Sequence, residues 1–167
     1  RYTLPLIVHI FGSVLALVIG PFQFLPRLRN TFPALHRWMG RTYLVGILLG
    51  GLGGLFMAFH AWTGWIAGLG FGALAVFWLW TGWNAYRTIR MRDVEAHQRW
   101  MLRNFALTFA AVMLRLLNPL LIVGLGFDGA VAYQVVAWLC WIPNLIVVEI
   151  WMVRRLPKPY GTSEIAA

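Results

Sequence analysis

Five long apolar segments constrain the fold of this 167-residue chain more than any other feature of its sequence. A transmembrane helix needs roughly 20 mostly apolar residues to cross the hydrocarbon core of a bilayer. The segments that meet this requirement are Leu4–Leu25, Thr42–Phe59, Trp65–Tyr86, Leu102–Leu125 and Val131–Val153. The sequence therefore predicts an all-α integral membrane protein, a bundle of five transmembrane helices. We expect residues 1–156 to form a single transmembrane domain and 157–167 to form a short cytoplasmic tail.

The composition agrees with a membrane protein and excludes several other classes. Of all residues, 60% are hydrophobic and 11% are charged, and the mean hydropathy is +0.71. A soluble domain averages about 25% charged residues, so a soluble enzyme and a polar disordered chain are both excluded. The single cysteine, Cys140, excludes a disulfide scaffold. Because the chain begins with Arg1 rather than methionine, we expect further residues before it.

The basic residues indicate how the helices are oriented in the membrane. Twelve of the 14 lysines and arginines lie in alternate connections, namely Arg27, Arg29, Arg37, Arg41, Arg87, Arg90, Arg92, Arg99, Arg103, Arg154, Arg155 and Lys158. The other two loops, 60–64 and 126–130, carry none. Because basic residues in short loops stay cytoplasmic, we expect the N-terminus outside and the C-terminus in the cytoplasm. Since topology accounts for the charge, we expect membrane lipids as partners and no nucleic acid.

A weak internal repeat relates the two halves of the chain. The runs HRWMGRTY from residue 36 and HQRWMLRNF from residue 97 share six residue types in the same order if Gln98 is an insertion. Each run precedes or opens an apolar segment on the basic side. This pattern predicts two helical hairpins, spans 1–2 and 3–4, related by a pseudo-twofold axis along the membrane normal. Chance similarity between two basic helix starts is the alternative, since Arg and Trp are common at that depth.

Small residues recur every four positions in the first three segments. The three ridges are Gly12, Ala16 and Gly20; Gly46, Gly50 and Gly54; and Gly64, Gly68 and Gly72. Such ridges let helix backbones approach closely in lipid, so we expect tight helix packing at them. The alternative is a flat cofactor lying against a glycine face. Pro21, Pro119 and Pro143 predict breaks or kinks, where Gln23, Asn118 and Asn144 could satisfy the freed carbonyls.

Polar side chains within the apolar segments fall into two layers by depth. The outer layer contains His9, His60, Arg115, Asn118 and Gln134, and the inner layer contains Gln23, His36, Asn84, His97 and Glu149. Two stripes at helical spacing, from His9 to Gln23 and from Asn104 to Asn118, should point into the bundle, because polar groups facing lipid would go unsatisfied. Arg115 and Glu149 differ too much in depth to form an ion pair. Arg115 therefore meets either an anionic ligand or backbone carbonyls and Asn118.

Two histidines in each layer are typical of a haem site. Axial imidazoles from facing helices hold b-type haem, and arginine often pairs with its propionates. The candidate haem ligands are His9 with His60 in the outer layer and His36 with His97 in the inner layer, and Arg115 and Asn118 are further candidate cofactor-binding residues. A quinone in the same cavity is an equal alternative. A plainer interpretation is that these histidines cap helices or contact headgroups.

The motifs of the chain resemble a bacterial family known only as predicted membrane proteins of unknown function. The resemblance rests on His9 with Gly12, the run GPFQF at 20–24, Leu28-Arg29, LHRWMGRTY at 35–43, HQRWMLR at 97–103 and AAVMLR at 110–115. It covers about residues 8–117 and implies a multi-pass protein of the bacterial cytoplasmic (inner) membrane. Its motif positions include His9, Gln23, His36, Arg41, His97, Arg103 and Arg115, but it implies no reaction. Such proteins usually carry a further hydrophobic segment at the front, which leaves the complete span count open.

These observations favour an intramembrane redox-related protein that binds haem b or a quinone-like ligand in the helix bundle. Two alternatives remain. A non-catalytic accessory or assembly subunit would use its aromatic residues and glycine ridges to contact a larger membrane complex or further copies of itself. A small-molecule permease would exploit broken helices around polar residues. The sequence assigns no catalytic residue and leaves open whether the protein is an enzyme.

Overall fold

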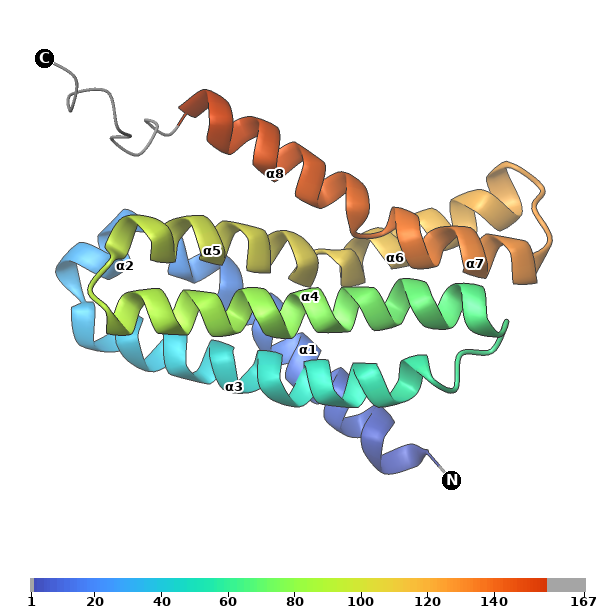
Figure 1. Cartoon of the computed structure of the whole chain (residues 1–167), viewed down its shortest axis with the longest axis horizontal. Helices are drawn as coiled ribbons and strands as arrows, with labels where there is room; N and C mark the ends of the chain where they lie inside the picture. The colour runs from blue at the N-terminus through green and yellow to red at the C-terminus, as the bar shows by residue number, and fades with distance from the viewer. Residues whose placement is uncertain (1, 156–167) are drawn as a thin grey trace, which may run out of the picture.

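The computed structural model describes residues 2–155, with side chains described as far as Met152, and this part of the chain is helical with short connections (Figure 1). The elements are α1 (Thr3–Gln23), α2 (Pro26–Thr31), α3 (Pro33–Ala58), α4 (Trp65–Arg90), α5 (Val94–Thr108), α6 (Ala110–Pro119), the π-helix η1 (Leu120–Gly124), α7 (Gly129–Leu139) and α8 (Ile142–Arg155). The expected tail, 157–167, lies outside the described residues.

Among residues 2–155, five helical stretches are long and apolar enough to cross a membrane, which confirms the predicted fold class. They are Thr3–Gln23, Pro33–Ala58, Trp65–Arg90, Val94–Gly124 and Gly129–Met152. The second and fourth begin nine and eight residues earlier than predicted, because their basic starts are also helical. Asp93 caps the start of the fourth stretch, where its side chain accepts a hydrogen bond from the Ala96 N–H at 2.9 Å. Hydropathy detects only the apolar part of such a helix.

Four helices form a ring around the core. α1 packs against α3, α3 against α4, α4 against α5, and α5 returns to α1, while α7 and α8 pack on the outside of α4 and α5. Figure 1 shows α3, α4 and α5 running alongside one another, with α1 crossing behind them. The end of the bundle formed by α2, the start of α3, the end of α4 and the start of α5 carries most of the arginines, and we call it the basic end.

Glycines bring α1 and α3 into backbone contact. A Cβ atom added at Gly12 would lie 2.5 Å from the Gly50 nitrogen and 2.6 Å from the Gly46 carbonyl oxygen. On α4, a Cβ atom at Gly68 would lie 2.9 Å from the Ala58 carbonyl oxygen of α3. The expected tight packing is therefore confirmed at these positions. No space remains between α1 and α3 for a flat cofactor.

Two of the three prolines interrupt their segments, and Pro21 lies in the last turn of α1. Pro119 is followed by the π-helix η1, and Pro143 is the second residue of α8. Asn144 satisfies a carbonyl group at the break before α8, as expected: its side-chain amide donates to the Cys140 carbonyl oxygen at 2.9 Å. A further break, at Phe109, has no proline to mark it. There the Val112 N–H bonds to the Phe109 carbonyl oxygen at 2.9 Å, a tighter turn that changes the helical rotation.

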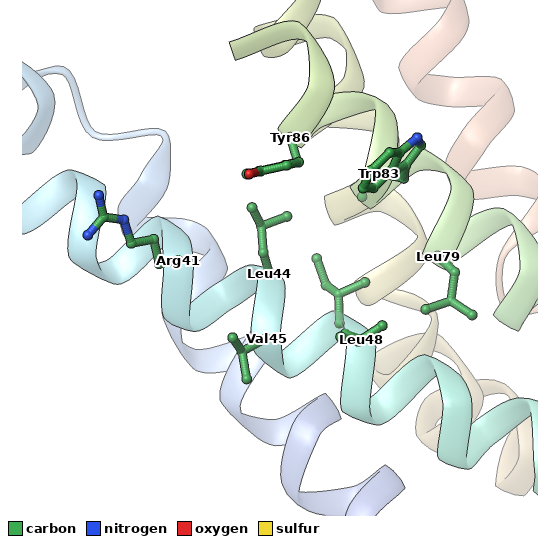
Figure 2. A pocket seen from close by; sticks show the side chains of 9 residues that line it. Arg41, Leu44, Val45, Leu48, Leu79, Trp83 and Tyr86 are labelled. Carbon is green, nitrogen blue, oxygen red and sulfur yellow. The ribbon is translucent and has the colours of Figure 1, made fainter. Parts of the chain in front are cut away.

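The outer surface between α3 and α4 is grooved. One groove, of about 320 Å³, lies between the halves of these helices nearer the basic end (Figure 2). A second, of about 710 Å³, lies between the end of α3 and the start of α4. Neither is lined by a histidine.

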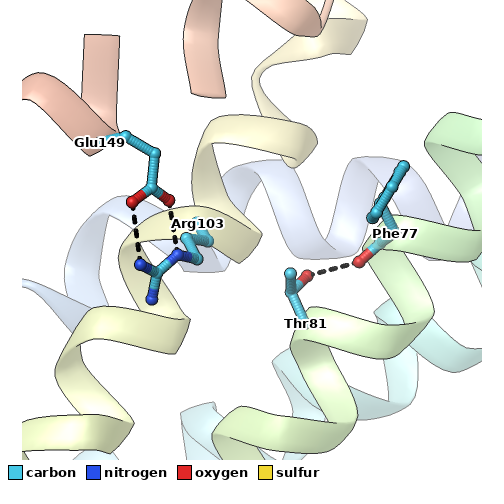
Figure 3. Close-up of polar contacts among 4 residues, drawn as sticks. All are labelled: Phe77, Thr81, Arg103 and Glu149. Atoms are coloured by element: carbon cyan, nitrogen blue, oxygen red, sulfur yellow. Dashed lines mark hydrogen bonds and ion pairs between the residues drawn. The ribbon is translucent and has the colours of Figure 1, made fainter. Parts of the chain in front are cut away.

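An ion pair joins α5 to α8, which packs beside it. Arg103 donates from Nε to Glu149 Oε1 at 2.6 Å and from Nη2 to Glu149 Oε2 at 2.9 Å (Figure 3). This two-point geometry is the strong form of a charge-assisted hydrogen bond. It also agrees with the expectation that Glu149 does not pair with Arg115.

Replacing Glu149 with glutamine should loosen α8 and lower the free energy of unfolding by about 1 kcal/mol, because half-exposed ion pairs contribute at this level. Chemical unfolding of the purified protein in mild detergent measures the change. Glu95→Gln is the matched control, since it removes the more exposed pair between Arg99 and Glu95 within one helix. Equal effects of the two variants would contradict the prediction.

Candidate functional site

The centre of the bundle contains a connected set of buried hydrogen bonds, which we call the central network. Asn104 is fully buried, and its amide nitrogen donates to the Trp78 carbonyl oxygen and to the Thr81 hydroxyl, each at 2.8 Å. Its amide oxygen accepts from the Tyr43 hydroxyl at 2.8 Å. The Thr108 hydroxyl oxygen accepts from the Trp78 indole at 2.8 Å and lies 3.1 Å from the Tyr43 hydroxyl oxygen. Because these groups satisfy one another, the network has a structural role and locks α3, α4 and α5 together.

The outer-layer histidines do not face each other. The His9 Nδ1 atom lies 2.7 Å from the Gly50 carbonyl oxygen, so this ring is held between α1 and α3. His60 is exposed beyond the end of α3, and its ring lies 4.2 Å from the Tyr2 ring centroid. Since Tyr2 precedes His9 by seven residues, the two histidines are offset by about 10 Å along α1. The geometry does not place a haem between them.

Arg115 does not point into the bundle, which corrects the expectation for its stripe. Its side chain is exposed, and Nη1 donates to the Ala111 carbonyl oxygen of the same helix at 2.7 Å. The break at Phe109 is the physical reason. It rotates the residues that follow relative to Asn104 and Thr108, which do lie in the core.

The other polar residues of the outer layer are also dispersed. Gln134 donates from Nε2 to the Thr63 carbonyl oxygen at 3.1 Å and so ties α7 to the loop before α4. The Asn118 Oδ1 atom is buried and has no hydrogen-bond partner among the described residues. The outer layer therefore provides separate contacts rather than one site.

The polar stripe of α1 does point inward and ends at a buried glutamine. Gln23 is only 8% exposed, and its Nε2 atom has no hydrogen-bond partner within the described part of the chain. Its Oε1 atom lies 3.2 Å from the position that a Cβ atom on Gly40 would take, so the amide abuts α3. His36 lies four residues before Gly40, on the same face of α3. The His36 Nδ1 atom is likewise buried, and no described residue bonds to it.

His97 completes this group from α5. It lies within electrostatic range of His36. Its Nδ1 atom lies 2.8 Å from the Ala85 carbonyl oxygen, and because a carbonyl only accepts, Nδ1 carries the proton. In the neutral ring Nε2 then carries the lone pair, which can accept a hydrogen bond or ligate a metal and has no partner among the described residues. We call Gln23, His36 and His97 the basic-end cluster.

An aromatic wall adjoins the cluster. Phe24 follows Gln23 directly, and its ring centroid lies 5.5 Å from that of Phe105 on α5. The Phe105 ring occupies the space beside Gly20, where a larger residue would collide with it. The cluster thus combines a few polar groups with flat apolar surface, as small-molecule sites commonly do.

The donor set of the basic-end cluster consists of one amide and two imidazoles. In the part of the chain that the structure describes, no three His, Cys, Asp or Glu side chains gather to hold a metal ion. The predicted bis-histidyl haem would use two imidazoles on facing helices, and His36 with His97 is the predicted pair that the structure keeps within electrostatic range of each other.

Comparison with known proteins identifies the family but no activity. The family model described as "Predicted membrane protein (DUF2306)" matches residues 6–152. The chain belongs to this family. The match runs from the fourth residue of the first apolar stretch to the end of the fifth, beyond the residues 8–117 that carry the motif resemblance. None of the curated proteins and none of the solved structures matches the chain.

Several residues that organise the site were missed by sequence reasoning. Tyr43, Trp78 and Thr81 carry the central network but look like ordinary apolar or interfacial residues in the sequence. The sequence puts Arg103 among the basic residues that set topology and among the motif positions, but it does not predict the ion pair with Glu149. The one signal available was its place three residues after Trp100 in the repeated motif, which does not reveal a partner on α8.

Proposed function

We propose that this membrane protein binds a quinone-type redox ligand at the basic-end cluster. The proposal rests on two buried side-chain nitrogens without partners in the described structure, Gln23 Nε2 and His36 Nδ1. The Gln23 amide lies beside Gly40 of α3, and His36 lies one turn before Gly40 on the same helix. Leaving a buried polar group unpaired costs about 1–3 kcal/mol. Two such groups at one place are typical of a site where a ligand supplies the missing hydrogen bonds.

The chemistry of the cluster matches a quinone carbonyl. Its oxygen accepts hydrogen bonds from an amide N–H and from an imidazole N–H, which are the groups that Gln23 and His36 offer. Phe24 and Phe105 provide flat apolar surface for the ring. A quinone dissolves in the bilayer, so it can reach the cluster laterally between helix ends. Arg29 and Arg37, which lie within electrostatic range of His36, would favour the negative charge of a reduced ligand.

One observation favours haem b as an alternative ligand of the same cluster. The Nδ1 atom of His97 bonds to a backbone carbonyl oxygen, and histidines that ligate metals usually fix their second nitrogen in this way. His36 would then be the second axial ligand. A reduced-minus-oxidised absorption spectrum distinguishes the two ligands, because a bis-imidazole haem shows Soret and α bands and a quinone shows neither.

The test is equilibrium binding of ubiquinone-1 and menaquinone-1 to the purified protein in detergent, followed by tryptophan fluorescence quenching. We expect Gln23→Leu and His36→Leu each to raise the Kd about tenfold, because each removes one hydrogen bond to the ligand and about 1.4 kcal/mol corresponds to a factor of ten. Both variants should elute from size exclusion as the native protein does.

Two substitutions serve as matched controls. Gln98→Leu changes an exposed glutamine on α5, and His60→Leu changes the exposed histidine at the opposite end. Both should leave the Kd unchanged. The proposal fails if the folded Gln23 and His36 variants bind both quinones as tightly as the wild type, or if the wild type binds neither.

A further inference from the structure

The groove between α3 and α4 near the basic end has a cation at one end and apolar walls along its length. Figure 2 shows Arg41 at this end, with Leu44 and Leu48 of α3 facing Leu79, Trp83 and Tyr86 of α4. Val45 also lines the groove. From Arg41 to Leu48 the groove extends about 10 Å along the helix axis. One leaflet of the hydrocarbon core is about 15 Å deep. The groove therefore runs from the interface through most of one leaflet.

Two arginines at this end are held by aromatic rings rather than by carboxylates. The Arg41 Cζ atom lies 4.9 Å from the Trp38 ring centroid, and the Arg90 Cζ atom lies 6.0 Å from that of Tyr86. Neither α3 nor α4 contains an acidic residue. In the described part of the chain, the two ion pairs involve Arg99 and Arg103 instead. Both guanidinium groups thus remain able to bind an anion.

We infer that this groove binds one anionic phospholipid from the leaflet at the basic end, with its phosphate at Arg41 and an acyl chain between α3 and α4. Guanidinium binds phosphate through two parallel hydrogen bonds, which distinguishes it from a simple point charge. The apolar walls match a hydrocarbon chain and offer no hydrogen-bond partner to a polar peptide. No residue of this groove belongs to the basic-end cluster, so the inference is independent of the quinone proposal.

The second groove between α3 and α4 differs from the first in having no charged residue, and this difference decides which groove can select an anionic lipid. It is the larger of the two, at about 710 Å³ against 320 Å³, and its walls include Leu55, Phe59 and Trp65. No charged residue lines it. It can accommodate hydrocarbon but cannot select a headgroup. The smaller groove has apolar walls for a hydrocarbon chain and also a cation, Arg41, that can select an anionic headgroup.

Native mass spectrometry of the purified full chain tests the inference, by titration with phosphatidylglycerol and with phosphatidylcholine of the same acyl chains. We expect phosphatidylglycerol to bind about tenfold more tightly than phosphatidylcholine, and Arg41→Gln to abolish that preference. Leu48→Trp should fill the groove and weaken both lipids about tenfold. Inorganic phosphate should not displace the lipid, because it gains nothing from the apolar walls.

Two controls separate a built site from general attraction to the surface. Arg27→Gln removes one exposed positive charge from α2, and Leu52→Trp enlarges an exposed leucine one turn beyond Leu48. Both should bind lipid as the wild type does. Equal losses in Arg27→Gln and Arg41→Gln, or in Leu52→Trp and Leu48→Trp, would overturn the inference. So would displacement by inorganic phosphate, or a dimer that Leu48→Trp dissociates, since a second copy would then fill the groove.

Discussion

Replacing Gly12 with alanine should force α1 away from α3 and lower the free energy of unfolding by about 3 kcal/mol or more. The new methyl carbon would lie 2.5 Å from the Gly50 nitrogen and 2.6 Å from the Gly46 carbonyl oxygen. Both obstacles are backbone atoms of a helix, so no side-chain rotation relieves the collision. Overpacking usually costs about 1–3 kcal/mol when neighbours can shift, and here a whole helix has to move.

The measurement is an unfolding titration in mild detergent, and Gly72→Ala is the matched control. Gly72 is also a helical glycine next to α3, but a Cβ atom there would make an ordinary contact of 3.7 Å with the Ala58 Cβ atom. This control should be neutral or slightly stabilising, because alanine has the higher helix propensity. Equal stability of the Gly12 and Gly72 variants would show that α1 and α3 are not in backbone contact.

Replacing Asn104 with aspartate should destabilise the protein by about 3 kcal/mol, although the two side chains have nearly the same size. The Asn104 amide nitrogen faces the Trp78 carbonyl oxygen at 2.8 Å, and that oxygen can only accept. Aspartate places a second acceptor there, inside a fully buried site. It also loses the hydrogen bond to the Thr81 hydroxyl in the present geometry. The same unfolding titration measures the effect.

Asn84→Asp is the matched control, because it makes the same replacement of an amide donor by a carboxylate acceptor. The Asn84 amide donates to the Trp80 carbonyl oxygen at 2.8 Å, but at the surface of the bundle, six residues before the end of α4. Its cost should stay below about 1 kcal/mol, since the new oxygen does not enter the buried core. Asn104→Leu should fall between the two aspartate variants, because leucine removes the hydrogen bonds without adding a repulsive oxygen. If Asn104→Asp costs no more than Asn84→Asp, the central network does not lock the helices as described.

The sequence predicts depth along the membrane only in part, and it does not predict rotation about each helix axis. Counting residues from the helix ends puts Gln23, His36 and His97 in one layer, and the structure brings them toward one region. The same counting puts His9 and His60 in one layer, yet in the structure they are offset by about 10 Å along α1. The sequence alone does not show that α1 crosses α3 obliquely in backbone contact. This crossing decides which residues of α1 lie beside which residues of α3.

Arg115 illustrates how a local break defeats a pattern that spans it. The stripe from Asn104 to Asn118 follows the period of one continuous helix. The tighter turn at Phe109 ends that continuity without a proline or glycine to announce it. Residues before the turn therefore lie in the core, while Arg115 is exposed. Arg115 therefore does not lie with the other outer-layer residues inside the bundle.

Within the described residues, the sequence by itself determined how many helices are long and apolar enough to cross a membrane, their approximate limits and the glycine positions where backbones meet. These features depend on hydropathy, length and side-chain size along one stretch of chain. Only the tertiary structure decided that Arg103 pairs with Glu149 and that Asn104 joins Tyr43 to Trp78. It also decided that the Gln23 Nε2 and His36 Nδ1 atoms lack hydrogen-bond partners among the described residues. Each of these facts depends on how distant helices are rotated and paired. Packing settles that rotation once the helices have formed, and no single helix encodes it.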